Sequence, residues 1–363
     1  MYTAIRSTHV YDSDLAAYQA KTILLQGPSI EALLPYHASL PDNCVVIDVG
    51  DHYVLPGFID GFSQIGAKEI GIRWEGEDET ETAQSDDLAP YRIIDSIYPF
   101  DAAFKEALAN GVTVSHVASG PGSVIGAQTA IVKHDGVTVD EMAITPSFGH
   151  SFSLGDIPKR TFKQQTNQPL TRMGIAASLR RYFDKHGTPA NVFIRAYHGT
   201  DIDTALRLQE EYAFTLTLVH GTGANERQLN ELKQRGASLF AGPMFQARER
   251  HEQQTLCPSF HKEVVLLGIP HAIISDHPTT SVRNLKLEAS LAVREGLDEK
   301  HALNALTLAT AECLGISDRT GSITAGKQAD IAIWNGDPLS LTSSVTHTFV
   351  SGKLCYEKEK DQR

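Results

Sequence analysis

The chain has 363 residues and a formal net charge of -12, with 41% hydrophobic and 21% charged residues, which is ordinary for a globular protein. The acidic balance argues against a nucleic-acid surface, because phosphate binding needs clustered Lys and Arg. We find no signal-peptide core in Met1 to Ala20 and no apolar run long enough to cross a bilayer, so we expect a cytoplasmic protein that does not use a membrane. Four cysteines without paired spacing agree with a reducing compartment; they are Cys44, Cys257, Cys313 and Cys355.

Short strand-like segments stand at both ends of the chain. They are Thr3 to Val10, Thr22 to Leu25, Val45 to Val49, Asp330 to Trp334 and Thr346 to Tyr356. Because the termini of a domain tend to lie close together, these segments predict one small β-sandwich domain that combines residues 1–54 with residues 322–363.

Helical and strand-like patterns alternate between these ends. The helix and strand pairs are Phe104 to Ala109 with Val112 to Val117, Leu170 to His186 with Val192 to Ala196, Asp203 to Glu211 with Thr215 to His220, Asn225 to Gln234 with Ser238 to Ala241, and Glu263 to Leu267 with His271 to Ser275. Such alternation indicates βαβ units and a parallel sheet. The number of units favours an α/β fold, a (β/α)8 TIM barrel over residues 55–321, with its functional site on the loops after the strands.

Two long polar segments interrupt this alternation. Residues 71–99 and 146–171 are predicted to be loops, of a length often found in lids over a site. The first contains the acidic run Glu75 to Asp87, which we interpret as a solvated loop and not as a cation site.

The stretch Val54 to Gly66 predicts a short buried strand at the start of the barrel. It resembles the first barrel strand of the amidohydrolase superfamily, which usually reads Pro-Gly-X-Ile-Asp-X-His-X-His. The segment from Asn304 through Trp334 resembles the closing signature of that superfamily. Middle segments resemble its imidazolonepropionase-like branch; they are Ile125 to Lys133, Thr171 to Gly174, His220 to Thr222 and Ser275 to Pro278. The resemblance implies a barrel with a β-sandwich and an ancestor that hydrolysed a C–N bond.

The same resemblance implies a metal site in which several ligand positions have changed. In the superfamily, histidines of strands one, five and six, an aspartate of strand eight and a carboxylated lysine after strand four hold two metal ions. Phe62 and Gln64 occupy the histidine positions of strand one, and Arg195 and Tyr197 those of strand five, with His198 one residue further on. The retained positions are His220, Asp276 and, for the bridging lysine, Lys133.

Two functions remain open from this pattern. The first is a hydrolase of cyclic amides or other non-peptide or dipeptide-like C–N bonds that uses one zinc-like divalent metal, held by Lys133, His220 and His198 or Gln64, with Asp276 as general base. The second is a metal-free pseudoenzyme that binds a small molecule or acts as a regulatory or scaffold protein. The changes on strands one and five favour the second. In it, Arg195 forms a buried ion pair with Asp276 and supplies the positive charge of a metal.

Further residues are predicted to contact a small-molecule substrate or ligand. Gln64, Arg195, Tyr197 and His277 stand at or beside the strand ends. Arg172, at the start of a predicted helix, is a candidate for binding a carboxylate bidentately, while an ion pair with an acidic residue is the simpler interpretation. Homo-oligomer formation is left open.

Overall fold

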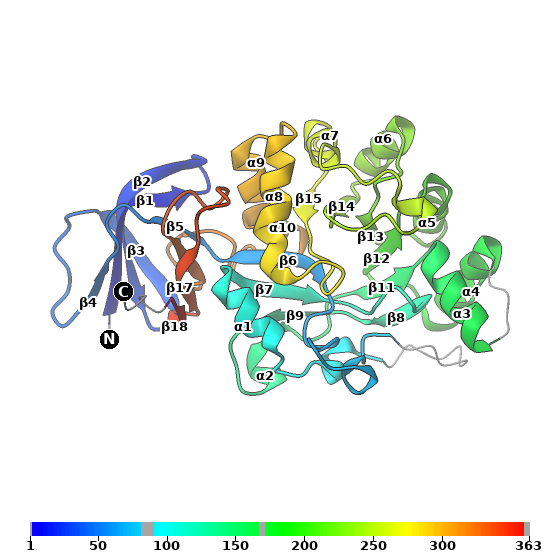
Figure 1. Cartoon of the computed structure of the whole chain (residues 1–363), viewed down its shortest axis with the longest axis horizontal. Helices are drawn as coiled ribbons and strands as arrows, with labels where there is room; N and C mark the ends of the chain where they lie inside the picture. Colours follow the sequence, from blue (N-terminus) through cyan, green and yellow to red (C-terminus); the bar gives the residue numbers. More distant parts are fainter. Residues whose placement is uncertain (1, 81–90, 167–170, 359–363) are drawn as a thin grey trace.

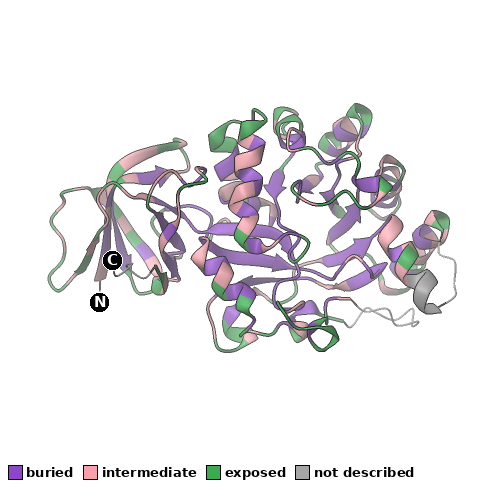
Figure 2. Cartoon of the chain, viewed as in Figure 1, coloured by how far each residue is buried: buried purple, intermediate pink, exposed green. Residues whose placement is uncertain are grey.

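The computed structural model describes residues 2–80, 91–166 and 171–358 (Figure 1). Its strands form three sheets, and helices from the middle and the last third of the chain flank the two inner sheets. The strands of the inner sheets are largely buried, whereas the helices expose their outer faces (Figure 2). This is a mixed α/β fold, as the sequence predicts.

The first sheet joins the two ends of the chain. Its order is β18-β17-β16-β5-β1-β2-β3, with β4 beside β1. The strands are β1 (Tyr2–Asp12), β2 (Ala17–Gln26), β3 (Ser29–Pro35), β4 (Val45–Asp48), β5 (Tyr53–Pro56), β16 (Ile331–Trp334), β17 (Val345–Val350) and β18 (Lys353–Glu357). The ends meet where β5 and β16 pair in antiparallel fashion, with Pro56 opposite Ile331. The predicted pairing of the two terminal segments is therefore confirmed.

The two inner sheets carry the ends of the strands that form the site. One has the order β10-β9-β7-β6 and the other β15-β14-β13-β12-β11-β8. Their strands are β6 (Phe58–Ser63), β7 (Val112–Val117), β8 (Ile125–Gln128), β9 (Ala130–Lys133), β10 (Ala143–Thr145), β11 (His150–Ser153), β12 (Asn191–Ala196), β13 (Thr215–His220), β14 (Ser238–Ala241) and β15 (His271–Ile273). Strands β11 to β15 run parallel, as do β6 and β7. Strands β8 and β9 instead run antiparallel to their neighbours.

The inner sheets meet beyond the end of β15. There the amide of Asp276 donates to the carbonyl of Phe62 at 3.2 Å, and the amide of Gln64 donates to the carbonyl of His277 at 2.9 Å. One buried apolar cluster contains side chains of both sheets, among them Phe62 and Phe193. These contacts fix the position of the segment after β15 relative to the end of β6.

The described residues contain α-helices, several of which begin at a residue whose side chain caps the first turn. The helices are α1 (Ala102–Ala109), α2 (Val139–Met142), α3 (Asp156–Thr166), α4 (Arg172–His186), α5 (Gly199–Tyr212), α6 (Glu226–Gln234), α7 (Phe260–Leu266), α8 (Leu285–Arg294), α9 (Glu299–Asn304) and α10 (Leu308–Cys313). Asn225 and Gln228 form a capping box on α6. Helix α4 starts at the cap Thr171 and ends at Gly187, whose φ of 77° favours glycine.

The prediction that residues 146–171 form a polar loop is wrong for residues 150–153 and 156–166. His150–Ser153 is the buried strand β11, and Asp156–Thr166 is the helix α3. The strand contains polar residues because its side chains find partners inside the protein; the Nε2 atom of His150, for example, lies 2.7 Å from the carbonyl of Gly126.

The acidic run Glu75 to Asp87 is partly described, since residues 81–90 lie outside the described residues. Glu75 and Glu77 are exposed, in agreement with a solvated loop, but Glu79 is buried. The interpretation as a solvated loop therefore fails at Glu79.

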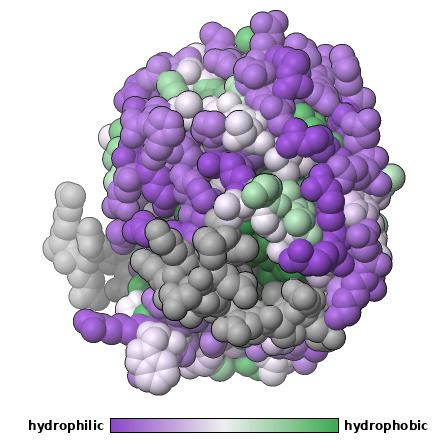
Figure 3. Space-filling view, turned by 90° about the vertical axis from the view of Figure 1, so that its right-hand side faces the viewer, coloured by the Kyte–Doolittle hydropathy of each residue, from purple (hydrophilic) through white to green (hydrophobic). Residues whose placement is uncertain are grey.

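No helix of the described ranges is long and apolar enough to cross a membrane. One face of the molecule is mostly hydrophilic, and hydrophobic side chains gather near its centre beside atoms that are not described (Figure 3).

Candidate functional site

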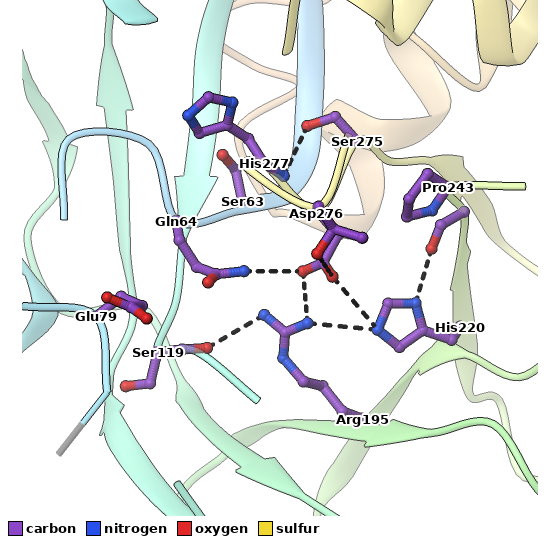
Figure 4. A network of polar contacts seen from close by, with 12 residues as sticks. Ser63, Gln64, Glu79, Ser119, Arg195, His220, Pro243, Ser275, Asp276 and His277 are labelled. Atoms are coloured by element: carbon purple, nitrogen blue, oxygen red, sulfur yellow. Dashed lines mark hydrogen bonds and ion pairs between the residues drawn. The ribbon is translucent and has the colours of Figure 1, made fainter. Parts of the chain in front are cut away.

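A buried ion pair stands at the centre of the candidate site (Figure 4). Arg195, near the end of β12, places its Nη1 atom 2.5 Å from Oδ1 of Asp276, which follows β15, and each side chain is only 3% exposed. The Nη2 atom of Arg195 donates to the carbonyl of Ser119 at 3.2 Å. The ion pair predicted from the sequence is confirmed.

The carboxylate of Asp276 receives further hydrogen bonds on both oxygens. The amide Nε2 of Gln64 donates to Oδ1 at 3.1 Å, and the hydroxyl of Thr279 donates to Oδ2 at 3.1 Å. These donors and the guanidinium together provide hydrogen-bond partners for both oxygens of the Asp276 side chain.

His220, at the end of β13, completes the cluster as a neutral imidazole. Its Nδ1 atom lies 2.7 Å from the carbonyl of Gly242, which can only accept, so Nδ1 carries the proton and Nε2 accepts from Arg195 at 3.3 Å. Burial lowers the pKa of His220 to about 4. Tyr197 stacks on the ring at 4.0 Å between centroids and shields it from solvent.

The backbone turns sharply at the two residues that project from the strand ends. His220 has a φ of 75° and Asp276 a φ of 48°, in the left-handed region that non-glycine residues rarely adopt. Residues in such conformations cost about 1 to 3 kcal/mol each and concentrate at functional sites. The strain therefore supports a functional role for this cluster.

A cavity of about 130 Å³ opens above the cluster. Its polar lining includes Arg195, Tyr197, His220 and Asp276, and its apolar lining includes Leu154 and Ile157. Arg195 also has a buried Nε atom without a hydrogen-bond partner among the described residues. A cavity that combines an apolar wall with a few converging polar groups is typical of a small-molecule site.

The residues at this place do not fit a divalent metal ion in the observed arrangement. Within the described parts of the chain, no three His, Cys, Asp or Glu side chains lie close enough together to hold one. The guanidinium of Arg195 contacts both His220 and Asp276, the two retained ligand types. A divalent cation bound by the same two atoms would lie against this positive charge, which is unfavourable in a buried site.

The structure does not bring Lys133 to the cluster. Strand β9 runs antiparallel to β7, so Lys133 lies opposite Val114, whereas Ala130 lies opposite Val117 nearer the site. The Nζ atom of Lys133 is 2.7 Å from Oδ1 of Asp330 and 2.7 Å from the hydroxyl of Ser351. The lysine thus ties β9 to the sheet formed by the chain ends.

The side chains of His198 and His277 make no hydrogen bond to Arg195, His220 or Asp276 among the described residues. Strand β12 ends at Ala196, and His198 caps α5 by accepting from the amide of Thr200. His277 is buried, and its Nδ1 atom accepts from the amide of Val282 at 3.2 Å.

Arg172 forms ion pairs with acidic residues of the protein, which is the simpler of the two interpretations of its sequence position. Its Nε atom lies 2.8 Å from Oδ1 of Asp201, and its Nη2 atom lies 3.3 Å from Asp156. The guanidinium therefore links α4 to α3 and α5.

Several residues of the site have no distinctive sequence pattern. Thr279 follows Asp276 by three residues, and a tight turn brings side chains at that spacing within hydrogen-bond reach. This spacing is the sequence feature from which the contact between Thr279 and Asp276 could be predicted. Ser119 contributes only its carbonyl, which any residue type supplies. Arg250 lines the cavity from a segment between β14 and α7, and its guanidinium carbon lies 5.9 Å from the centre of the Tyr197 ring.

Comparison with known proteins places this geometry in a family. The model of the amidohydrolase family matches residues 184–355. The solved structure of an amidohydrolase from Thermotoga maritima MSB8 superposes with a TM-score of 0.91 at 26% identity, covering 98% of this chain and 100% of that one. The chain thus matches the amidohydrolase family model over just under half of its length and resembles a solved amidohydrolase over nearly all of it. The family recognised from the strand-one and closing segments is thereby confirmed.

Two curated relatives of this chain are longer proteins. Amidohydrolase tasK of Hapsidospora irregularis is 24% identical over 380 residues, covering 88% of this chain and 38% of that protein. N-substituted formamide deformylase of Arthrobacter pascens is 26% identical over 176 residues, covering 44% of this chain and 32% of that protein. The chain thus spans about a third of the length of the curated relatives it matches.

The buried histidines of this fold predict acid sensitivity. Burial lowers the pKa to about 4 for His116, His150, His220 and His271 and to about 3 for His134. An unfolded histidine binds a proton below about pH 6.5, whereas these folded histidines stay neutral, so the free energy of unfolding falls as the pH drops from about 6.5 towards 4.

Urea unfolding at several pH values between 7.5 and 5 measures this loss. His116→Leu removes one of these groups from the aromatic cluster that contains Phe62 and Phe193, so the variant should lose less stability per pH unit than the parent. His301→Gln changes an exposed histidine and should leave the slope unchanged. Equal slopes for the parent and His116→Leu would contradict the assignment.

Proposed function

We propose that this chain binds a small compound with a C–N bond, such as an amide or a cyclic amide, in the cavity above Asp276, and that Arg195 supplies the positive charge that a metal supplies in hydrolytic relatives. The observation that carries the proposal is the 2.5 Å contact between Arg195 Nη1 and Asp276 Oδ1, with His220 on the same guanidinium nitrogen. The chemistry of the ligand follows from relatives whose names include a formamide deformylase.

The proposal includes the architecture that frames the cavity. Residues 55–321 form a (β/α)8 barrel, and residues 1–54 with 322–363 form a β-sandwich domain. The hydrogen bond from the amide of Asp276 to the carbonyl of Phe62 supports closure of the barrel between β15 and β6. The position of the cavity after the ends of β12 and β13 agrees with the location of sites in such barrels.

The charged and neutral side chains around the cavity are suited to binding a ligand with a carbonyl group. The orphaned Nε of Arg195 offers a donor to a ligand oxygen, and the neutral ring of His220 adds no charge. The apolar side chains of Leu154 and Ile157 accommodate a small aliphatic group. A ligand carbonyl therefore gains a hydrogen bond from a charged donor, which is worth about 1.5 to 3 kcal/mol.

The second candidate is a one-metal hydrolase of the same compounds. The approach of His220 Nε2 to Asp276 Oδ2, at 3.8 Å, favours it, because these two side chains are metal-ligand types held at the strand ends. Members of the superfamily are generally metal-dependent. The one-metal reaction requires Arg195 to leave its present position.

Ligand binding in the absence of metal distinguishes the two functions. After treatment with a chelator, we expect small amides such as leucinamide and 2-piperidone to raise the melting temperature, with no release of ammonia or amine. Ile157→Trp fills the cavity and should abolish the shift, whereas Leu266→Trp, on the exposed face of α7, should leave it unchanged.

Zinc dependence would overturn the metal-free proposal. If the shift appears only with added zinc and amide hydrolysis accompanies it, the one-metal hydrolase is correct. If none of the amides shifts the melting temperature under either condition, the proposed ligand class is wrong.

A further inference from the structure

A second cavity, of about 500 Å³, adjoins the first one. The two share Pro121, Ile157 and Thr279 in their linings, and Gln64 lines the second while donating to Asp276 below the first. A ligand that occupies the first cavity can therefore extend into the second past the side chain of Gln64.

The second cavity has an excess of negative charge. Among the described residues that line it, the charged side chains are Lys68, Glu77 and Glu79, so two carboxylates share one ammonium group. The Nζ atom of Lys68 lies 3.2 Å from Oε1 of Glu79 and 3.6 Å from Glu77.

Glu79 is the carboxylate in which one oxygen lacks a hydrogen-bond donor among the described residues. Its side chain is 8% exposed, and Oε1 accepts from Lys68 and from the hydroxyl of Thr80 at 3.1 Å. The other oxygen, Oε2, is buried and has no hydrogen-bond partner among the described residues. A buried carboxylate oxygen without a donor is costly, so a ligand that brings a donor to it gains the energy of an otherwise unmade bond.

The backbone between the two cavities holds Glu79 next to the ion-pair cluster. The amide of Gly120 donates to the carbonyl of Glu79 at 2.7 Å, and the preceding residue, Ser119, accepts from Arg195. A Cβ atom on Gly120 would come within 2.7 Å of the Glu79 side chain and 3.3 Å of Oε1 of Gln64. Figure 4 shows Glu79 on the side of Gln64 that faces away from His220.

We infer that Glu79 forms a subsite for a protonated amine, so that the ligand is a small amide that carries an ammonium group as well as a carbonyl. The carbonyl is recognised by the guanidinium of Arg195 and the ammonium by Oε2 of Glu79. This inference rests on the proposed function, because it names a second group of the ligand that the first cavity binds.

A matched pair of compounds tests the subsite. L-leucinamide carries the amine, and 4-methylpentanamide has the same carbon skeleton and amide without it. Their dissociation constants are measured by calorimetry with chelator-treated protein at a pH at which the amine is protonated. We expect L-leucinamide to bind at least about ten-fold more tightly than 4-methylpentanamide, because its ammonium group forms a charge-assisted hydrogen bond with Glu79.

Variants of the loop assign this preference to one residue. Glu79→Gln should remove the preference by weakening L-leucinamide alone, and Glu75→Gln, an exposed acid of the same loop, should preserve it. Melting temperatures of both variants confirm that they fold.

Each other outcome overturns the inference. If both compounds bind the parent equally well, or if the preference survives in Glu79→Gln, the amine subsite is refuted while the proposed function stands. If neither compound binds the folded parent, the proposed function fails together with the subsite.

Discussion

Replacing Arg195 by Met should lower the free energy of unfolding by about 3 to 5 kcal/mol, because it leaves the buried carboxylate of Asp276 without its cation. The expected loss is large because both side chains are almost fully buried and the guanidinium also donates to the carbonyl of Ser119. Chemical denaturation of the parent and the variant at neutral pH measures the difference.

Two further variants show whether the loss comes from the unpaired charge. The double variant Arg195→Met with Asp276→Leu removes both charges, and it should recover much of the stability because no isolated buried ion remains. Arg180→Met breaks the partly exposed pair with Glu211 and should cost about 1 kcal/mol or less. A loss for Arg195→Met no larger than that for Arg180→Met would show that the ion pair is not buried as described.

Replacing Lys133 by Met should also cost about 3 to 5 kcal/mol, because Asp330 loses its counter-ion inside the protein. Asp330 is completely buried as a side chain and accepts further bonds from the hydroxyl of Thr320 at 2.8 Å and the amide of Ser351 at 2.8 Å. Lys133 contributes the charge that balances this carboxylate between β9 and the sheet of the chain ends.

The matched control for Lys133 is Lys353→Met, which breaks an exposed pair with Asp135 and should change stability by about 1 kcal/mol or less. Burial lowers the pKa of Lys133, and the negative charge of Asp330 opposes that effect. A Lys133→Met protein with unchanged stability and lost zinc binding would instead support the bridging role that the family resemblance implies.

Apolar runs made most of the strands predictable. Residues 112–117, 215–220 and 238–241 were predicted as strands with the same bounds as β7, β13 and β14, because each combines branched or aromatic residues with flanking turns. Strand β11 was missed, since His150 and its serines are polar in type but buried in the fold. Burial of polar residues with internal partners leaves no mark in a hydrophobic pattern.

The site was predictable where strands run parallel. His220 and Asp276 each follow an apolar run, and parallel strands deliver their ends to the same edge, so the two meet with Arg195 as predicted. Lys133 also ends an apolar run, but β9 runs antiparallel to β7. No residue pattern within β9 indicates the direction of the strand. Glu79 belongs to an acidic run, and only the fold distinguishes its buried side chain from the exposed Glu75 and Glu77.

The mass of the native protein tests the central claim most directly, namely that Arg195 occupies the position of a metal. The protein is expressed and purified with zinc present, and native mass spectrometry then counts bound ions and any carboxyl group added to a lysine. We predict the mass of the unmodified chain without stoichiometric zinc. Two bound ions together with one carboxylated lysine would contradict the account.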